Sequence, residues 1–112
     1  MNIIERKQND ITVLDLDGNL ALEGSAEFRK CVTATIDAGA RKLIINMARV
    51  SYMDSRGLDE LIFFYATLCR MGGRLKLLHL NGPLRHLLVA TKLTAILETF
   101  DSEPAAVASF SQ

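Results

Sequence analysis

The chain has 112 residues, of which 49% are hydrophobic and 23% are charged. This length supports one hydrophobic core and the composition is too apolar for a disordered chain, so we expect a single domain spanning residues 1–112. Thirteen basic and thirteen acidic residues cancel, which argues against nucleic-acid binding because nucleic-acid binders usually carry a basic surplus. No segment has the apolar length of a bilayer span, and the N-terminus lacks a signal-peptide core. We therefore expect a cytoplasmic protein with no membrane contact.

The first third of the chain predicts two strands and a helix. Residues 3–7 and 11–16 are expected to be strands joined by a hairpin turn at Asn9-Asp10, and the second run is apolar on both faces, as in a strand that is covered on both sides. A turn signal at residues 17–19 follows. We then expect a helix that opens at Gly24-Ser25, with one of these residues as its cap, and closes at Gly39. Its buried stripe is predicted to contain Phe28, Val32, Thr35 and Ile36.

The rest of the chain alternates strand-like and helix-like runs. The expected strands are residues 42–47, 74–80 and 95–100, and the expected helices are residues 58–71, 84–91 and a short segment capped by residues 101–104. Such alternation is typical of an α/β fold, here a mixed β-sheet of about four to five strands with α-helices packed against it.

Two pairs of residues in the predicted helices invite a functional interpretation. Cys31 and Cys69 have no metal or redox spacing, so we expect buried thiols. Phe64 continues the apolar face of its helix and is expected in the core. Phe63 is expected at the flank of that helix, packed there or partly exposed.

The common catalytic constellations are missing from the sequence. It contains no Gly-x-Ser-x-Gly elbow, no Walker loop and no Gly-x-Gly-x-x-Gly motif. His79 and His86 have no ligand partners at metal-binding spacing, so we expect structural or solvent-facing roles and no metal site. A triad of Ser55, His79 and Asp54 is disfavoured because Asp54 is the direct neighbour of Ser55. We expect neither an enzyme nor a bound cofactor.

The segment from Val50 to Leu58 carries the candidate site, because it joins the clearest strand to the clearest helix. Serine at such a junction can be a cap, a nucleophile, a ligand or a phosphate acceptor. No base is placed to activate it, and no glycine loop or metal cluster accompanies it. The cap and the phosphate acceptor remain, and they are compatible: Asp54 is the expected N-cap, which leaves Ser55 exposed at the positive end of the helix.

The run Met53-Asp54-Ser55-Arg56-Gly57-Leu58, placed between that strand and a helix ending in Gly72-Gly73, resembles the STAS domain of bacterial anti-anti-sigma factors, also called anti-sigma factor antagonists. The resemblance covers nearly the whole chain. It includes the turn at residues 17–20, the late helix at 84–93 and the last strand at 96–100.

The resemblance implies a function. An anti-sigma factor with ATP-dependent serine kinase activity would phosphorylate Ser55. The unphosphorylated chain would bind that partner and release its target, often a sigma factor, and a metal-dependent serine phosphatase would reset the cycle. We expect a monomer when the chain is free. The implied partner surface contains Asn19, Leu20, Ala21, Met53, Asp54, Ser55, Arg56, Gly57 and Asp59, in which Met53 would offer a soft apolar contact and Gly57 would let a partner backbone approach.

One residue departs from the family pattern. Many members carry an acidic residue directly after the Gly-x-Leu turn, where this chain has Ala21. Any contact of that acid is lost or taken over, with Asp17 and Glu23 as candidates.

Two other functions stay open. One is a STAS subunit that works without phosphorylation in a transporter or ligand-sensing complex. The other is a phospho-aspartate receiver with Asp15 and Asp17 as its magnesium pair, which is disfavoured because the central strand ends in Asn46-Met47 rather than in aspartate.

Overall fold

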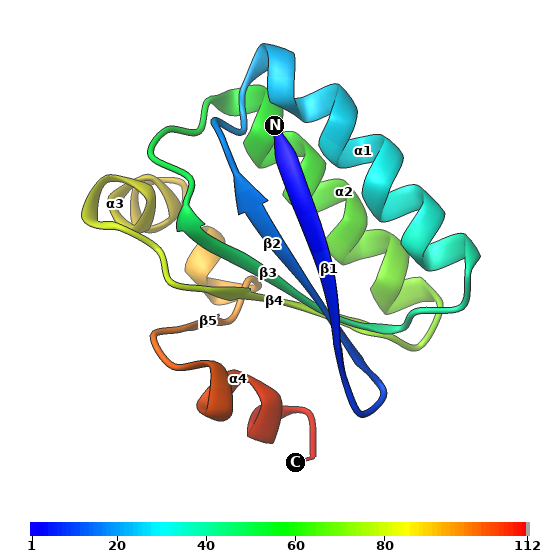
Figure 1. Ribbon diagram of the computed structural model, residues 1–112. Helices are drawn as coiled ribbons and strands as arrows, with labels where there is room; N and C mark the ends of the chain where they lie inside the picture. Colours follow the sequence, from blue (N-terminus) through cyan, green and yellow to red (C-terminus); the bar gives the residue numbers. More distant parts are fainter. Residues whose placement is uncertain (112) are drawn as a thin grey trace.

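Five strands form one mixed sheet in the computed structural model, which describes residues 1–111. The strand order follows the sequence (Figure 1). The edge strand β1 pairs antiparallel with β2, and every later neighbour is parallel. The expected α/β class and mixed sheet are confirmed. The strands are β1 (Asn2–Gln8), β2 (Ile11–Asp17), β3 (Lys42–Arg49), β4 (Arg74–Leu78) and β5 (Thr99–Phe100).

The helices are distributed unevenly over the sheet. Two long helices lie side by side on one face, and the short C-terminal helix lies on the opposite side of the sheet (Figure 1). Right-handed crossovers explain the pairing, because both long helices connect neighbouring parallel strands that advance in the same direction across the sheet. The helices are α1 (Leu22–Asp37), α2 (Ser55–Arg70), α3 (Gly82–Ala90) and α4 (Glu103–Ser109), with a 3₁₀ turn, η1 (Leu93–Ala95).

Strand β2 is buried on both faces, as its sequence predicts. Leu14 and Leu16 join the large core beneath α1 and α2. Ile11 and Val13 belong to a smaller cluster that includes Ala106 of α4. Because side chains alternate between the two faces of a strand, β2 contributes residues to two separate cores.

The buried stripes of the long helices match the sequence pattern. Phe28, Val32, Thr35 and Ile36 of α1 are all buried. Phe64 of α2 is 2% exposed and packs edge-to-face on Phe28, with ring centroids 5.9 Å apart, whereas Phe63 is 48% exposed. Both phenylalanine predictions are confirmed.

The predicted start of α1 and the predicted burial of the two thiols are wrong. Helix α1 begins at Leu22 after Ala21, which gives no side-chain cap, so neither Gly24 nor Ser25 opens it. Gly24 instead lies buried inside the first turn. Cys31 and Cys69 are only partly buried, because they sit at the margins of the helix stripes.

Two strands are shorter than predicted. Strand β4 ends at Leu78 because His79 adopts a left-handed conformation with φ of 60°. The predicted strand 95–100 is mostly irregular: after η1, Leu97 turns into the core, and only Thr99 and Phe100 pair with β4. Apolar side chains in this segment therefore reflect burial rather than extended backbone.

Candidate functional site

The strand-to-helix junction lies at the carboxyl edge of the parallel strands, where two loops run together. Leu20 and Met53 form an isolated parallel β-bridge. The Leu20 amide donates to the Tyr52 carbonyl at 3.0 Å, and the Asp54 amide donates to the Leu20 carbonyl at 3.4 Å. The turn after β2 is thereby fixed against the segment that leads into α2.

Asp54 caps α2, as predicted. Its Oδ1 accepts hydrogen bonds from the amides of Arg56 at 2.9 Å and Gly57 at 3.3 Å. Its backbone is extended, with φ of −107° and ψ of −172°, as is usual for an N-cap. The cap satisfies two of the free amides at the helix start and adds negative charge at the positive end of the helix dipole.

Ser55 is the first residue of the 16-residue helix α2, and it is exposed. Its hydroxyl is therefore free of the capping role, which Asp54 fills. A phosphate at this place would meet the positive end of the helix dipole, an electrostatic environment that favours anions. The geometry allows modification of Ser55 without unfolding the helix start.

We expect Asp54→Ala to lower the free energy of unfolding by about 0.5–2 kcal/mol, because two amides lose their acceptor. Asp54→Asn should retain most of this stability, since asparagine is also a good N-cap. Urea unfolding followed by far-UV circular dichroism measures both. A value for Asp54→Ala that equals that of wild type would contradict the capping role.

Three residues of the expected partner surface are buried, which corrects the roles inferred from the sequence. Leu20 and Met53 are 0% and 4% exposed and belong to the large core. A Cβ on Gly57 would lie 2.0 Å from the Leu20 carbonyl oxygen, so this glycine makes room for the chain's own backbone rather than for a partner. These residues hold the two loops together. The accessible members of the set are Asn19, Ala21, Asp54, Ser55, Arg56 and Asp59, of which Ala21 and Asp54 are half-buried.

Two exposed apolar residues near the junction were missed by sequence reasoning. Leu22 in the first turn of α1 is 59% exposed, and Tyr52 in the loop before Asp54 is 55% exposed. Both line a hollow of about 400 Å³ that also includes Glu23 and Asp54. The signal for Leu22 was present in the sequence, because it falls six residues before Phe28 and outside the buried stripe of α1.

On its other side, Tyr52 borders a second hollow. This one has a volume of about 310 Å³ and is lined mainly by apolar residues of the loop and of α3, among them Met53, Leu84 and Leu87. His86 is exposed and also lies at this hollow. Within residues 1–111, no group of three or more His, Cys, Asp or Glu side chains could hold a metal ion.

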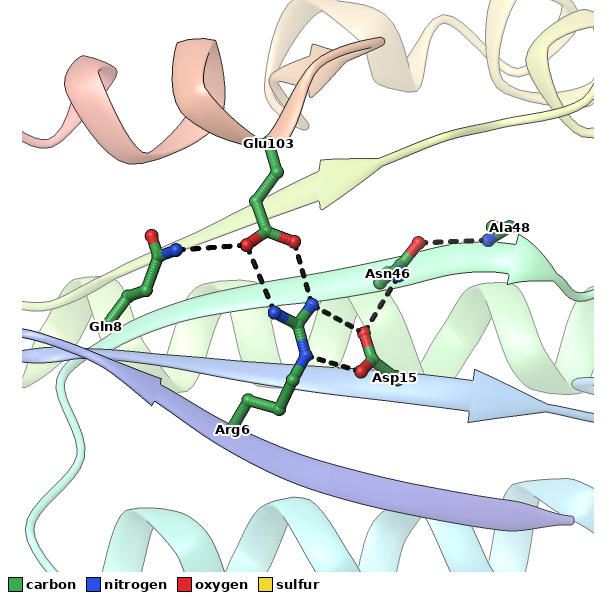
Figure 2. A network of polar contacts seen from close by, with 6 residues as sticks. All are labelled: Arg6, Gln8, Asp15, Asn46, Ala48 and Glu103. Atoms are coloured by element: carbon green, nitrogen blue, oxygen red, sulfur yellow. Dashed lines mark hydrogen bonds and ion pairs between the residues drawn. The ribbon is translucent and has the colours of Figure 1, made fainter.

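A second polar cluster lies away from the junction, between the sheet and α4 (Figure 2). Arg6 of β1 donates to both carboxylate oxygens of Asp15 on β2, at 2.6 and 2.9 Å. It also donates to both oxygens of Glu103 at the start of α4, at 3.1 and 2.7 Å. Asn46 of β3 donates to Asp15 at 2.8 Å. We call Arg6, Asp15 and Glu103 the arginine clasp.

The clasp perturbs the titration of its carboxylates. The hydrogen bonds from Arg6 hold the pKa of Asp15 and the pKa of Glu103 below their ordinary values, although partial burial opposes the shift. The two carboxylates in turn raise the pKa of Arg6. Asp15, considered above as half of a magnesium-binding pair, is thus engaged by Arg6.

The sheet order, the helix pair on one face and the exposed serine after the capping aspartate together define a STAS-type α/β domain. A family model described as "STAS domain" matches residues 2–106, so the chain belongs to the STAS-domain family. Among residues 1–111, no helix has the length and apolar character needed to cross a membrane.

Solved structures of several proteins share this fold. The protein TM1081 from Thermotoga maritima is 21% identical with a TM-score of 0.94, and the match covers 98% of this chain and 95% of that chain. The anti-sigma factor antagonist SpoIIAA has been solved unphosphorylated (20% identity, covering 98% of this chain and 97% of that one) and, from Bacillus, phosphorylated (22%, covering 97% and 99%), each with a TM-score of 0.75.

A transporter relative has the same fold. A sulfate transporter family protein from Wolinella succinogenes is 23% identical with a TM-score of 0.77, and the match covers 91% of this chain and 85% of that chain. At these identities the likeness establishes the fold, and function has to be argued from the site.

Proposed function

We propose that this chain is an anti-sigma factor antagonist controlled by phosphorylation of Ser55. In its unphosphorylated form it binds an anti-sigma factor that is also an ATP-dependent serine kinase, and that partner then releases its target. Phosphorylation of Ser55 ends the binding, and a metal-dependent serine phosphatase restores it. In this proposed cycle the chain is a substrate and a switch rather than an enzyme, and it acts in the cytoplasm, where the partner kinase finds its ATP.

The observation that carries the proposal is that Asp54 caps α2 while the neighbouring Ser55 is exposed. Asp54 holds the first-turn amides of α2, so the exposed Ser55 hydroxyl has no structural task. A serine that served as the cap would be withdrawn from a kinase, and its modification would break the helix start. Here the acceptor can gain and lose a phosphate while the cap stays in place.

Charge explains why phosphorylation would end binding. A phosphate adds about −1.5 to −2 charges at neutral pH. Asp54 and the exposed Asp59 lie within the same turn and a half of helix, and Glu23 lies with Asp54 at the neighbouring hollow. A partner that fits the unphosphorylated surface has no group placed to pair with the added charge, the nearby carboxylates repel it, and burying an unpaired charge is unfavourable.

We propose that the partner surface contains the exposed Asn19, Ser55, Arg56 and Asp59, with Leu22 and Tyr52 added as apolar contacts. Ala21 stands where many family members carry an acid. Glu23 is the acidic side chain nearest in sequence to Ala21, and it lines the hollow together with Asp54. It is therefore a better replacement candidate than Asp17. The buried Leu20, Met53 and Gly57 support this surface from below.

The test is phosphosite mapping combined with pull-downs. Wild-type protein incubated with ATP and extract of the source cells should acquire phosphate on Ser55, and Ser55→Ala should acquire none. Ser111→Ala is the control, since Ser111 is an exposed serine that follows α4, on the opposite side of the sheet from α2, and it should behave as wild type. Ser55→Glu should bind the partner captured by wild type at least about 30-fold more weakly, the effect of an unpaired charge in an interface.

A different result would support the other candidate function. If Ser55 stays unmodified and Ser55→Glu retains the wild-type partners with the wild-type affinity, the phosphorylation switch is wrong. The chain would then act as a STAS subunit that does not depend on phosphorylation.

A further inference from the structure

Two glycines, one at the start of each long helix, contact neighbouring peptide carbonyls of a single loop. A Cβ on Gly24 in α1 would lie 2.2 Å from the Asn19 carbonyl oxygen. A Cβ on Gly57 in α2 would lie 2.0 Å from the Leu20 carbonyl oxygen. Both distances are far below van der Waals contact, so any larger residue would force the backbone apart. The backbone of residues 19–20 is therefore wedged between the two helix starts.

Hydrogen bonds tie the same loop to the residues that precede Ser55. The Leu20 carbonyl accepts from the Asp54 amide, and the Leu20 amide donates to the Tyr52 carbonyl. The Ser51 hydroxyl donates to Asn19 Oδ1 at 3.0 Å. Leu20 itself is fully buried. A displacement of residues 19–20 would thus move Tyr52 and Asp54 directly, through these hydrogen bonds.

We infer that Gly24 is a positioning residue for the Ser55 site, acting across the Asn19–Leu20 backbone on the start of α2. Gly24 is distant in sequence from Asp54 and Ser55, and it lies on α1 rather than α2. Its missing side chain sets how closely α1 approaches residues 19–20, and this loop sets where the capped first turn of α2 stands. The first turns of α1 and α2 form one coupled unit.

If Ser55 is phosphorylated, the coupling extends the effect of the phosphate from α2 to the start of α1. This consequence rests on the proposed function. A phosphate on Ser55 would be felt in the first turn of α1, around Leu22 and Glu23, as well as at the modified residue. A partner that contacts both helix starts would meet a change over its whole footprint. The coupling itself is a property of the fold and can be measured without any partner.

Three glycine-to-alanine variants of the full ¹⁵N-labelled chain test the coupling. Gly24→Ala should shift the amide resonances of residues 54–57 and increase hydrogen exchange at the Asp54 amide, because displacing the loop would lengthen the hydrogen bond from this amide to the Leu20 carbonyl. Gly73→Ala is the matched control for destabilisation, because its Cβ would lie 2.3 Å from the Arg41 carbonyl oxygen. Gly73 directly precedes β4 and Arg41 directly precedes β3, so this contact lies at the opposite end of the parallel strands from Ser55. Gly82→Ala is the control for the substitution alone, since its Cβ would meet nothing within 4 Å.

We expect Gly73→Ala to lower the melting temperature while leaving the resonances of residues 54–57 at their wild-type positions, and Gly82→Ala to change neither. Unchanged resonances at 54–57 in Gly24→Ala would overturn the inference. Equal shifts in Gly24→Ala and Gly73→Ala would also overturn it, because they would reflect general loosening.

A reciprocal measurement keeps the test decisive if Gly24→Ala fails to fold. In Ser55→Glu, the amides of residues 21–24 should shift more than those of residues 72–74, because coupling between two places acts in both directions. Equal or absent shifts at residues 21–24 would reject the coupling. The two proposals can fail separately. If the amide shifts show coupling but Ser55 is not phosphorylated, only the switch is rejected. If Ser55 is phosphorylated but the amide shifts show no coupling, only the role of Gly24 is rejected.

Discussion

Phe64→Ala is expected to lower the free energy of unfolding by about 3–5 kcal/mol, as is typical when a buried phenylalanine is truncated. Phe64 is 2% exposed, and its ring packs edge-to-face on that of Phe28, at the contact between the two long helices. The substitution removes apolar burial, loses the aromatic pairs with Phe28 and Phe63, and leaves a cavity. Because small domains have only about 5–15 kcal/mol of stability, this change takes a large share. Urea unfolding followed by circular dichroism measures it.

Phe63→Ala is the matched control, with the same chemistry one residue away. Phe63 is 48% exposed and contacts Arg29, whose guanidinium lies 5.1 Å from the ring centroid. It also packs edge-to-face on Phe64, with ring centroids 5.2 Å apart. We expect a loss of about 1–2 kcal/mol, from an exposed cation–π contact, this aromatic pair and partial burial. Similar losses in the two variants would contradict the assignment of Phe64 to the core and Phe63 to the surface.

Arg6→Leu is expected to lower the free energy of unfolding by about 1.5–3 kcal/mol at pH 7. The substitution leaves the carboxylates of Asp15 and Glu103 partly buried and facing each other without their common cation. It also weakens the link between β1 and the start of α4, because both Arg6–Glu103 hydrogen bonds are lost while the bond from Gln8 to Glu103 at 3.2 Å remains (Figure 2). The range reflects the partial exposure of the clasp, since solvent screens such pairs.

The loss caused by Arg6→Leu should shrink as the pH falls. In wild type, Arg6 lowers the pKa of both Asp15 and Glu103, so the clasp contributes its full stability above the unfolded values of about 3.9 and 4.3. That contribution disappears as the pH falls through the lower folded values, because the folded state resists the protons that the unfolded state accepts. The variant lacks this contribution at every pH. Its difference from wild type should therefore narrow below about pH 4.

Urea unfolding from pH 7 to pH 3 measures this trend, with Arg85→Leu as the control. Arg85 pairs with Asp101 at 2.8 Å, but the side chains are 42% and 81% exposed, so we expect a loss below about 1 kcal/mol. A loss for Arg6→Leu that stays constant between pH 7 and pH 3 would show that packing, rather than the ion pairs, holds α4 to the sheet.

These two regions lie on opposite faces of the sheet and stabilise different parts of the domain. The contact between Phe28 and Phe64 fixes α2 against α1, and with it the register of the two helix starts. The clasp holds α4 over the second core. A binding surface that is rigid before modification suits a switch that works by added charge, because little ordering is needed when the partner docks.

The local sequence was sufficient to predict much of the architecture and the exposed position of Ser55 at the start of a helix. Periodicity assigned the stripes of α1 and α2, because side-chain burial repeats with the geometry of each element. The cap was predictable for the same local reason: Asp54 bonds to amides only two and three residues away. Ser55 could therefore be placed at an exposed helix start from the order of residues alone.

Contacts between distant segments decided the rest. The sequence assigned Met53 and Gly57 to a partner, but the turn after β2 reaches across and buries both, through the Leu20 backbone. The clasp joins residues 97 positions apart. Periodicity and capping act within a few residues, whereas the backbone packing that positions Ser55 exists only once the turn after β2 and the two helix starts have come together.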